Sequence, residues 1–307
     1  MPSISIITIN YNQSELTKKF VDSVIKYTPS PVNYEIIIVD NCSEVNDFEN
    51  LKDILKNYNV NIIRSNINTG FGGGNMFGVQ FATGNYLAFI NNDVLFIEDS
   101  LSSLKSFLNG NKKIGVVTPQ QLNINQEPVY TFDHFHGIRK LLFGTKFVEL
   151  TSKKVKRKKI KYTSIFPVDL VLGSFMFFNK KAFSEIGGFD TNIFFYYEEM
   201  DVCYRLKKNG YASFVNATTA YIHDEGRSTK AHYNIKKERN ISRLYVLRKN
   251  HNYIKYSIIR FYFLIKWVLK SIFKPMYFDM VLIILKGAYT ESSLKHQQKN
   301  IFLKESF

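Results

Sequence analysis

Residues 86–93 have the sequence Tyr-Leu-Ala-Phe-Ile-Asn-Asn-Asp, and this stretch decides the fold class. Five mostly apolar residues in a row predict a strand that is buried on both faces, as in a parallel sheet. Ligands of open α/β sheets bind beyond the carboxyl ends of such strands, so Asn91, Asn92 and Asp93 are expected to border a ligand site. Turn chemistry is the alternative explanation, because Asn and Asp are common in turns.

The residues before this stretch alternate between predicted strands and predicted helices. Such alternation is typical of βαβ units and of a mostly parallel, doubly wound sheet flanked by helices. Asn12, with Glu15 three residues later, predicts a capped start for the first helix. The strands are expected at Ser3–Ile9, Tyr34–Val39 and Asn61–Arg64, and the helices at about 12–27, 47–57 and 70–82.

The second half of the chain continues the sheet with longer connections. A helix is expected at about 98–109, and a strand at Ile114–Thr118 that Pro119 stops. Val168–Asn179 is a further buried strand or strand pair, in which Gly173 marks a bend. A short helix at 180–186 and a last strand at Ala212–His223 complete the predicted elements.

Residues 120–165 carry two features without a clear pattern around them. His134 and His136 are expected to be surface-loop histidines, with metal ligation as the alternative. The basic run at 153–161 is expected to be a solvated loop, and the alternative is a contact to anionic lipid head groups.

Polar side chains follow the predicted strands at the edge where their carboxyl ends meet. Thr8 and Asn10 end the first strand, Asp40 ends the second, and Asp93 follows the fourth. A carboxylate can bind ribose hydroxyls, and a diphosphate needs a divalent cation or backbone amides. The glycine cluster at 70–74 lets the backbone approach a ligand closely, although it matches neither the dinucleotide nor the Walker spacing. This edge is therefore a predicted nucleotide site.

Three acids follow an aromatic run at 194–197: Glu198, Glu199 and Asp201. Burial against aromatic rings raises the pKa of a carboxyl toward the range of a general base. A helix start, which favours acids through its dipole, is the alternative, and both explanations can hold together. His223 ends the last strand and is expected to return to the same edge as Asp93.

The net charge of +15 and the pI near 9.5 favour an anionic partner, which could be nucleic acid, a membrane surface or a phosphorylated substrate. Cys42 and Cys203 alone do not suggest a disulfide framework and fit a reducing compartment. The first residues lack a signal-peptide pattern, and no uncharged run reaches the length of a spanning helix. We therefore expect a cytoplasmic protein.

Taken in order, these segments resemble the inverting glycosyltransferases of family 2, which have the GT-A fold. The resemblance covers roughly residues 3–230, with a nucleotide-sugar half at about 1–119 and an acceptor half at about 165–230. The glycine loop and the acidic helix are most similar to the rhamnosyltransferase-like branch, which builds bacterial surface polysaccharides. The matching pieces are Thr-Ile-Asn-Tyr-Asn (8–12), Val-Asp-Asn (39–41), Asn-x-Gly-Phe-Gly-Gly-Gly-Asn (68–75), Asn-Asn-Asp (91–93), Gly-Gly-Phe-Asp (187–190), Tyr-Glu-Glu-x-Asp-Val-Cys-x-Arg (197–205), and His223 with Arg227-Ser228.

The resemblance implies a role for each matching residue. Asp93 and His223 would bind Mg²⁺ or Mn²⁺, Glu199 would be the catalytic base, and Asp201 would support the start of its helix. Asp40 would hold the base or ribose of the nucleotide-sugar. The nucleotide-sugar side comprises Thr8, Asn10, Asp40, Asn68, Gly70, Asn75, Asn91 and Asn92, and the acceptor side comprises Gly173, Tyr197 and Glu198.

Asn91 departs from the family pattern, because it stands where the Asp-x-Asp motif has its first Asp. The chemistry is otherwise consistent with these residue types. A cation neutralises the leaving diphosphate, and a base on the opposite face takes the proton of the acceptor hydroxyl. One displacement inverts the anomeric centre, without the carboxylate nucleophile of retaining hydrolases.

Residues 231–307 are expected to form a helical, basic and amphipathic extension. A helix at Tyr253–Phe273, ended by Pro275, places four cations close together on one side and leaves a broad apolar face. The same helix contains Trp267. This pattern predicts a helix in a membrane interface, which suits an acceptor on a lipid diphosphate. Packing on the catalytic domain or at a homodimer contact is the alternative. The cations are Lys255, Arg260, Lys266 and Lys270, and the apolar face is Phe261, Leu264, Ile265, Val268 and Ile272.

Three other functions compete with an inverting, metal-dependent transferase that uses dTDP-rhamnose or a UDP-sugar. A sugar nucleotidyltransferase would need an Arg-containing activating loop after the first strand, which Asn10-Tyr11-Asn12 lacks. A nucleic-acid-binding protein is suggested by the pI, but no nucleic-acid-binding motif accompanies the charge, so no nucleic-acid partner is expected. A non-catalytic scaffold that binds a sugar nucleotide stays open because of Asn91.

Overall fold

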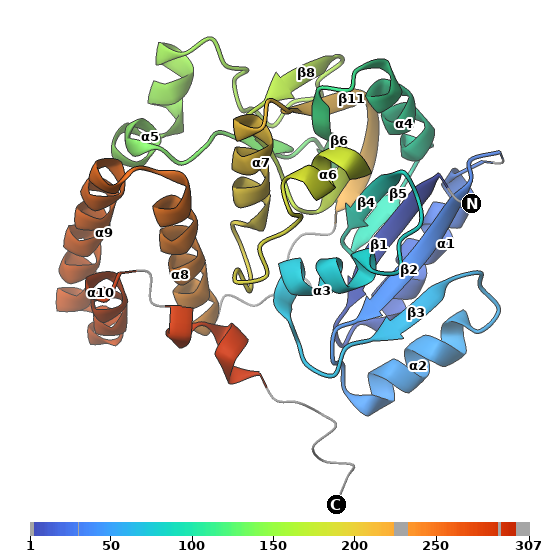
Figure 1. The fold of residues 1–307 in the computed structure, drawn as a ribbon, viewed down its shortest axis with the longest axis horizontal. Coiled ribbons are helices and arrows are strands. Elements are labelled where there is room, and N and C mark those ends of the chain that lie inside the picture. The colour runs from blue at the N-terminus through green and yellow to red at the C-terminus, as the bar shows by residue number, and fades with distance from the viewer. Residues whose placement is uncertain (1–2, 30, 224–232, 288–289, 299–307) are drawn as a thin grey trace, which may run out of the picture.

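The structure, a computed structural model, describes residues 3–29, 31–223, 233–287 and 290–298. Its centre is a nine-stranded sheet with the strand order β3-β2-β1-β4-β10-β6-β11-β5, and β8 pairs with β11. The last helices of the chain lie together beside this sheet (Figure 1). The predicted α/β class, with a mostly parallel sheet between helices and a C-terminal helical part, is confirmed.

The amino-terminal half forms the expected parallel unit. Strands β2 and β4 both pair in parallel with β1, and β3 pairs in parallel with β2. These strands are apolar on both sides, and this arrangement buries both sides because helices cover the two faces of the sheet. The elements are β1 (Ile4–Asn10), α1 (Ser14–Tyr27), β2 (Tyr34–Asp40), α2 (Val45–Leu55), β3 (Asn61–Arg64), α3 (Gly70–Val79) and β4 (Tyr86–Ile90).

The second half extends the sheet from an antiparallel strand. Strand β10 lies between β4 and β6 and runs against both, with Phe175 opposite Ile90. Strand β11 then pairs in parallel with β6 and returns His223 to the position opposite Val94. The elements are β5 (Val94–Phe96), α4 (Ser100–Gly110), β6 (Ile114–Leu122), β7 (Phe132–Asp133), α5 (Ile138–Thr151), β8 (Ile165–Val168), β9 (Leu170–Val171), β10 (Phe175–Asn179), α6 (Lys180–Glu185), α7 (Glu198–Lys208) and β11 (Ala212–His223).

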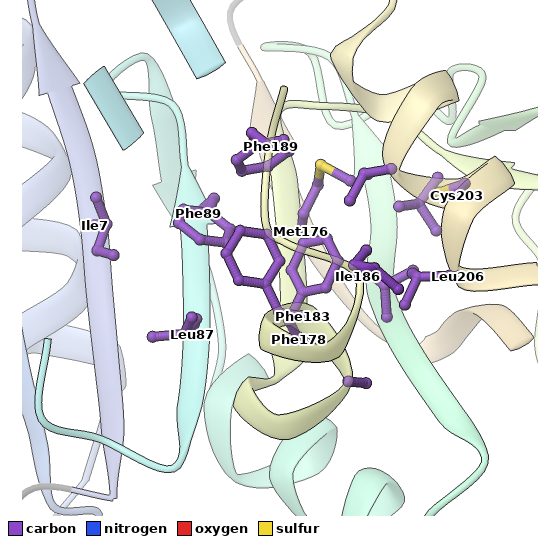
Figure 2. Close-up of a cluster of buried hydrophobic side chains, with 14 of the residues drawn as sticks. Ile7, Leu87, Phe89, Met176, Phe178, Phe183, Ile186, Phe189, Cys203 and Leu206 are labelled. Atoms are coloured by element: carbon purple, nitrogen blue, oxygen red, sulfur yellow. The ribbon is translucent and has the colours of Figure 1, made fainter. Parts of the chain in front are cut away.

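Each face of the sheet carries its own hydrophobic core. One core packs α1, α2 and α4 against the sheet, and the other packs α3, α6 and α7 against the opposite face. Figure 2 shows the second core, where the rings of Phe89, Phe178, Phe183 and Phe189 gather. The Phe89 and Phe189 ring centres are 4.9 Å apart at 69°, an edge-to-face geometry worth about 1 kcal/mol beyond simple burial.

Strand β6 does not stop at Pro119, so that prediction was wrong. The strand continues to Leu122, and the neighbouring strand β11 adapts to the proline instead. Its register on β6 shifts between Asn216, opposite Pro119, and Ala220, opposite Gln120. Proline lacks the N–H that a regular ladder needs, and a bulge in the partner strand accommodates this.

The predicted cap of the first helix was also wrong. Asn12 has a φ of +55°, and its Oδ1 accepts a hydrogen bond from the backbone N–H of Glu44 at 2.7 Å. The helix begins at Ser14, whose N–H donates to Asp47 Oδ1 at 3.0 Å. A carboxylate from the next helix therefore serves the helix start, which no local pattern shows.

His134 is not a surface-loop residue. Its side chain is buried, with Nε2 3.3 Å from Glu149 Oε1 and Nδ1 3.7 Å from Asp169 Oδ2. The basic run is likewise tied to the domain, because Lys154 pairs with Asp169 and Arg157 Nε donates to the carbonyl of Phe132 at 2.9 Å. Asp169, just before β9, and Asp133 of β7 bring carboxylates to these cations, so the expected solvated loop is in part an ion-pair network.

The C-terminal helices form a third hydrophobic core and dock on the sheet domain. Helix α8 contacts α7 and places Tyr245 and Lys249 against Asp190, at 2.9 and 2.7 Å. Ile138 and Leu141 of α5 pack against the same core. The elements are α8 (Tyr233–Asn250), α9 (Tyr253–Phe273), η1 (Pro275–Tyr277), α10 (Phe278–Leu285), η2 (Thr290–Ser292) and η3 (Leu294–Gln297).

Helix α9 has the predicted bounds, and it packs through a stripe beside the predicted apolar face. Tyr256, Ile259, Phe263 and Trp267 are buried in the third core. Trp267 is only 7% exposed and lies against Tyr277, whereas Phe261, Ile265, Val268 and Ile272 of the predicted face are exposed. Trp267 therefore belongs to the packed stripe and not to the exposed face.

Gly70 provides a test of how α3 is placed. Its φ is +73°, and a Cβ at this position would lie 2.0 Å from the carbonyl oxygen of Phe194. We therefore expect Gly70→Ala to lower the free energy of unfolding by more than about 1 kcal/mol. Chemical denaturation measures this, with Gly110→Ala as the control because a Cβ there meets nothing within 4 Å. Equal stability of the two variants would contradict the close approach of α3 to Phe194.

Candidate active site

A cavity of about 270 Å³ lies where the carboxyl ends of β1, β2 and β4 meet the start of α3. Its position is the one that open α/β sheets use for ligands. Of the predicted nucleotide-sugar residues, the cavity wall contains Asn68, Gly70, Asn75, Asn91 and Asn92, and it also contains Asp93. The remaining wall residues are Ile9, Tyr11, Gln13, Asn41, Phe71, Ile90, Phe194, Phe195 and Ile235.

Asn41 organises the glycine loop at one side of this cavity, a role that the sequence did not reveal. Its Nδ2 donates to Asn68 Oδ1 at 3.0 Å and to the carbonyl of Gly70 at 3.2 Å. Its Oδ1 accepts from the N–H and the hydroxyl of Thr69, both at 3.1 Å. The loop is thus held in place before any ligand arrives, which lowers the ordering cost of binding.

Thr8, Asn10 and Asp40 lie beneath the cavity wall rather than in it. All three side chains are buried, and Asn10 Nδ2 donates to Asp40 Oδ1 at 3.0 Å and to Asp47 Oδ2 at 2.9 Å. The other Asp40 oxygen is 3.3 Å from Arg64 Nε. These residues join the ends of β1 and β2, and Asn41, the next residue along the chain from Asp40, is the one that reaches the cavity.

The other predicted nucleotide-sugar residues form hydrogen bonds with the protein around the cavity. Asn75 Nδ2 donates to the carbonyl of Phe71 at 3.0 Å, and Asn92 Nδ2 donates to Thr17 Oγ1 at 3.0 Å. The backbone N–H of Asn91 donates to the carbonyl of Ser174 at 3.0 Å. Hydrogen bonds within the protein therefore fix this part of the cavity wall.

Asp93 and His223 meet at the edge of the cavity, as the sequence predicted from their places at strand ends. Asp93 is buried, and its Oδ1 is 3.1 Å from Nε2 of His223. Within the described residues, this Oδ1 accepts no hydrogen bond. A buried, unpaired carboxylate oxygen is costly unless a ligand or ion satisfies it.

The pair fits a shared divalent cation. Neighbouring ligands of an octahedral Mg²⁺ with bonds of about 2.1 Å lie about 3 Å apart, close to the observed separation. In the part of the chain that the structure describes, no group of three His, Cys, Asp or Glu side chains could hold a metal by itself. Mg²⁺ commonly takes one or two protein ligands, with substrate phosphates and water completing the shell, so two ligands suffice.

Gln121 lies against the ring of His223. Its Nε2 is 3.2 Å from His223 Nδ1, and its Oε1 accepts from the hydroxyls of Ser174 and Tyr221, each at 3.1 Å. Metal binding through Nε2 requires the proton on Nδ1, and Gln121 must then present its amide oxygen to the histidine. The two hydroxyls can donate or accept, so they satisfy either orientation of the amide.

Glu198 and Glu199 begin helix α7 directly after the aromatic run that lines the cavity. Tyr196 and Tyr197 have φ values of +69° and +74°, an uncommon conformation that turns the chain into the helix. Burial raises the pKa of Glu198 well above its usual range, and the adjacent Glu199 charge adds to this. Burial also raises the pKa of Glu199, while Glu198 and Arg239 oppose the rise. The pair therefore combines a proton-holding carboxyl with a neighbour that is the stronger acid.

Asp201 lies in a different environment from Glu198 and Glu199. It is fully buried and binds Arg205 Nε at 2.8 Å, Asn250 Nδ2 at 3.0 Å and Lys249 Nζ at 3.1 Å. Three hydrogen-bonding partners from α7 and α8 leave it as a link between these helices. Its place therefore supports the start of α7 rather than contact with a reacting group.

The predicted acceptor-side residues Tyr197 and Gly173 lie beside different parts of the site. The hydroxyl of Tyr197 is 3.4 Å from Nδ1 of His136, whose Nε2 is 3.7 Å from Asp133 Oδ2. Gly173 precedes β10, and a Cβ there would lie 4.0 Å from the ring of Phe71, a wall residue of the cavity. Arg227 and Ser228, which belong to the same motif as His223, lie outside the described residues.

The fold and this site define a GT-A glycosyltransferase-type architecture, and the sequence assigns the family. The model of glycosyl transferase family 2 matches residues 5–187, which is more than half of the chain. The chain therefore belongs to this family, as the order of the motifs indicated.

Two characterised relatives are similar over most of this chain. The rhamnosyltransferase WbbL of Escherichia coli is 26% identical over 239 residues, which are 73% of this chain and 86% of that protein. The low-salt glycan biosynthesis hexosyltransferase of Haloferax volcanii is 24% identical over 217 residues, which are 68% of this chain and 62% of that protein. The chain thus spans less than two thirds of the archaeal relative.

Solved structures share the fold at low sequence identity. A mannosyltransferase from Pyrobaculum calidifontis, in complex with GDP-Man and Mn²⁺, has a TM-score of 0.57 at 12% identity and covers 95% of this chain and 87% of its own. GalNAc-T7 with UDP, GalNAc and Mn²⁺ has a TM-score of 0.62 at 15% identity and covers 80% of this chain but 48% of its own. These likenesses confirm the GT-A fold.

The raised pKa of Glu198 predicts how stability depends on pH. A carboxyl whose pKa is higher in the folded state stabilises the fold at low pH, and this contribution disappears as the pH rises through the raised pKa. We expect Glu198→Gln to remove that loss of stability. The melting temperature of the variant, relative to that of the wild type, should therefore rise as the pH increases from 5 to 8.5. Differential scanning calorimetry measures this, with the exposed Glu44→Gln as control. A constant difference between Glu198→Gln and wild type would contradict the raised pKa.

Proposed function

We propose that this chain is an inverting, metal-dependent glycosyltransferase that moves a sugar from a nucleotide-sugar to a hydroxyl of a growing, lipid-linked surface polysaccharide. The observation that carries this proposal is the buried Asp93 Oδ1, which accepts no hydrogen bond within the described chain and lies 3.1 Å from His223 Nε2, at the edge of the strand-end cavity. A diphosphate in this cavity would come within reach of both side chains.

Asp93 and His223 would hold Mg²⁺ or Mn²⁺, as the Mn²⁺ in the two GT-A complexes suggests. When bound, the cation neutralises charge on the departing nucleoside diphosphate. Asn68, Asn75, Asn91 and Asn92 would orient the nucleotide-sugar through amide groups on the wall. Asn91 is neutral where the family motif has Asp, so Asp93 carries the negative charge of this motif alone.

The buried residues beneath the wall would act by positioning. Asp40, Asn10 and Thr8 join the strand ends below the nucleotide, and a direct contact of Asp40 with base or ribose would require it to release Arg64. Gly70 would let the backbone of α3 approach the donor closely.

Glu199 would take the proton from the acceptor hydroxyl. Burial raises the pKa of Glu198 further than that of Glu199, so Glu198 would hold the proton of the pair and donate a hydrogen bond to the Glu199 carboxylate. Asp201 would fix the start of α7 so that Glu199 stays aligned. Tyr197, Glu198 and Gly173 would border the acceptor, and the single displacement inverts the anomeric centre.

The donor is proposed to be dTDP-rhamnose, with a UDP-sugar as second choice. Similarity to a rhamnosyltransferase and to a hexosyltransferase supports these two classes. A scaffold that binds a sugar nucleotide without turnover is the second candidate, which Asn91 favours because it removes one carboxylate from the motif.

Nucleotide-sugar binding should depend on Asp93 and on the metal. With Mn²⁺ present, one member of a panel of dTDP- and UDP-sugars is expected to stabilise the wild type by about 2.7 kcal/mol at 100 times its Kd, which a thermal shift detects as several degrees. Chelation or Asp93→Asn should abolish the shift, whereas the exposed control Asp53→Asn should retain it. No shift with any nucleotide-sugar on folded wild type would overturn the proposal.

A Glu199→Gln variant then separates the enzyme from the scaffold. It should bind the donor as the wild type does and lose about 10²- to 10⁴-fold in transfer or donor hydrolysis, because a general base is worth that much. Wild-type protein that binds donor but shows the same turnover as Glu199→Gln would favour the scaffold.

The exposed faces of the C-terminal helices support association with an anionic membrane at the cytoplasmic face. Phe261, Ile272 and Phe273 are 63%, 67% and 85% exposed, and apolar side chains of α5 and α10 are exposed as well. In the described residues, no helix is long and apolar enough to cross a membrane. Exposed apolar surface bordered by lysines matches a helix that lies in the lipid interface.

This association can be measured by flotation with phosphatidylglycerol vesicles. Replacing Phe261, Ile265 and Ile272 by Gln is expected to lower vesicle binding at least tenfold, because each buried apolar side chain contributes about 1.5–3 kcal/mol. The control replaces Ile25, Val45 and Phe81, which are also exposed but lie on the nucleotide half. If the wild type ignores vesicles and instead forms homodimers that the first variant breaks, the surface is a dimer contact and the membrane proposal fails.

A further inference from the structure

A second cavity, of about 330 Å³, lies between α8 and α9 where they meet the start of α7. We call it the basic cavity, because five of its wall residues are cations. Its volume is at the lower end of the range of small-molecule sites. The cations are Lys236, Arg239, Arg243, Lys266 and Lys270, and the other wall residues are His136, Tyr197, Asn240, Phe263 and Trp267.

Among the residues that the structure describes, none of the five cations forms an ion pair with a carboxylate, whereas the nearby Lys237 and Lys249 pair with Asp279 and Asp190. The pKa of Lys266 is lowered by burial and then by the charges of Arg243 and Lys270. Cations held close together repel one another, and an anion between them would reduce that repulsion.

Arg243 shows that the cavity is built rather than incidental. Its guanidinium lies 4.4 Å from the ring centre of Phe263 and 6.0 Å from that of Tyr197, and it donates a hydrogen bond to Asn240 Oδ1. Its Nε is buried, and across the described ranges it has no hydrogen-bond partner. A planar guanidinium that is fixed by aromatic rings with a donor to spare is suited to phosphate oxygens.

The basic cavity lies next to the proposed reaction centre. Ile235 at the start of α8 lines the nucleotide cavity, and the next residue, Lys236, lines the basic cavity. The aromatic run separates the two cavities in the same way, with Phe195 on one side and Tyr197 on the other, and Glu198 and Glu199 follow directly. Arg239 acts on Glu199 electrostatically and lowers its pKa.

The outer wall of the basic cavity belongs to the helix with the exposed apolar face. Lys266 and Lys270 of α9 line the cavity, and Ile265 and Leu269, one residue before each, are exposed. In Figure 1, α9 is the outermost of these helices and α8 lies between it and α7. A ligand with an anionic group beside a long apolar chain would match this arrangement.

We propose that the basic cavity binds the diphosphate of a lipid-linked acceptor, so that the acceptor sugar reaches Glu199 while the lipid lies along α9. This inference rests on the proposed function, because it assigns the acceptor side of the same site. Arg239 and Arg243 bind the diphosphate oxygens, and Lys236, Lys266 and Lys270 supply the surrounding charge.

Inorganic pyrophosphate is the probe that tests the cavity. We use isothermal titration calorimetry on the full chain in EDTA and 150 mM NaCl, since chelation removes a metal that would bind pyrophosphate at Asp93 and salt screens weak surface attraction. The wild type and Asp93→Asn are expected to bind alike. The double variant Arg239→Gln/Arg243→Gln should lose at least tenfold in affinity.

Two further variants keep the test decisive. Lys236→Gln/Lys270→Gln changes exposed side chains of the cavity, so it should lose at least threefold in affinity even if the arginine variant is unstable. Lys255→Gln/Lys274→Gln removes the same charge from exposed positions outside the cavity and should bind as the wild type does. Equal losses in both lysine variants, or no pyrophosphate binding by the wild type, would overturn the inference.

Two further comparisons complete the test. One distinguishes the possible sources of the anion, and the other distinguishes failure of this inference from failure of the proposed function. A prenyl diphosphate is expected to displace pyrophosphate from the cavity better than phosphatidylglycerol vesicles do. If the vesicles compete equally well, the cavity is a lipid-headgroup contact and the acceptor assignment fails. The nucleotide-sugar thermal shift should be unchanged in the cavity variants. If the wild type binds pyrophosphate but shows no thermal shift with any nucleotide-sugar, only the donor-site proposal fails.

Discussion

The buried carboxylate of Asp201 is the constraint on which the arrangement of both candidate sites depends. It binds Arg205 of its own helix and Lys249 and Asn250 of α8. Arg205 in turn donates to the carbonyls of Ile186 and Gly188, both at 2.6 Å. One charge therefore fixes the start of α7, the turn before it and the docked α8, and removing it would take away the carboxylate that Arg205 binds.

Polar residues at the strand ends have two distinct physical roles. Asp40 is enclosed by Asn10, Ser43 and Arg64, so its charge is satisfied within the protein and it stabilises the edge of the sheet. Asp93, which follows β4 two strands away, keeps an oxygen without a hydrogen bond from the described chain and faces His223. An unsatisfied buried oxygen costs stability, and a site that binds a cation accounts for that cost.

The excess of positive charge is concentrated where the proposed acceptor would lie. The cations of the basic cavity stand between the paired carboxyls of α7 and the exposed apolar side of α9. Their field also acts on Glu199, whose pKa burial raises and Arg239 lowers. An anion bound in this cavity would weaken the lowering effect of Arg239 on the pKa of Glu199, so occupancy of the acceptor side would make Glu199 a stronger base.

The sequence by itself determined the order of strands and helices up to β4, the strand-end positions of Asp93 and His223, and the bounds of β11 and α9, because periodicity and local composition govern these features. Tertiary structure alone decided which strand-end side chains reach the cavity, that β6 passes through Pro119, and that His134 and Trp267 are buried. It also brought together the basic cavity from two helices and a loop. The physical reason is that side-chain burial and ion pairing depend on contacts between segments that are distant in the chain, which local patterns do not encode.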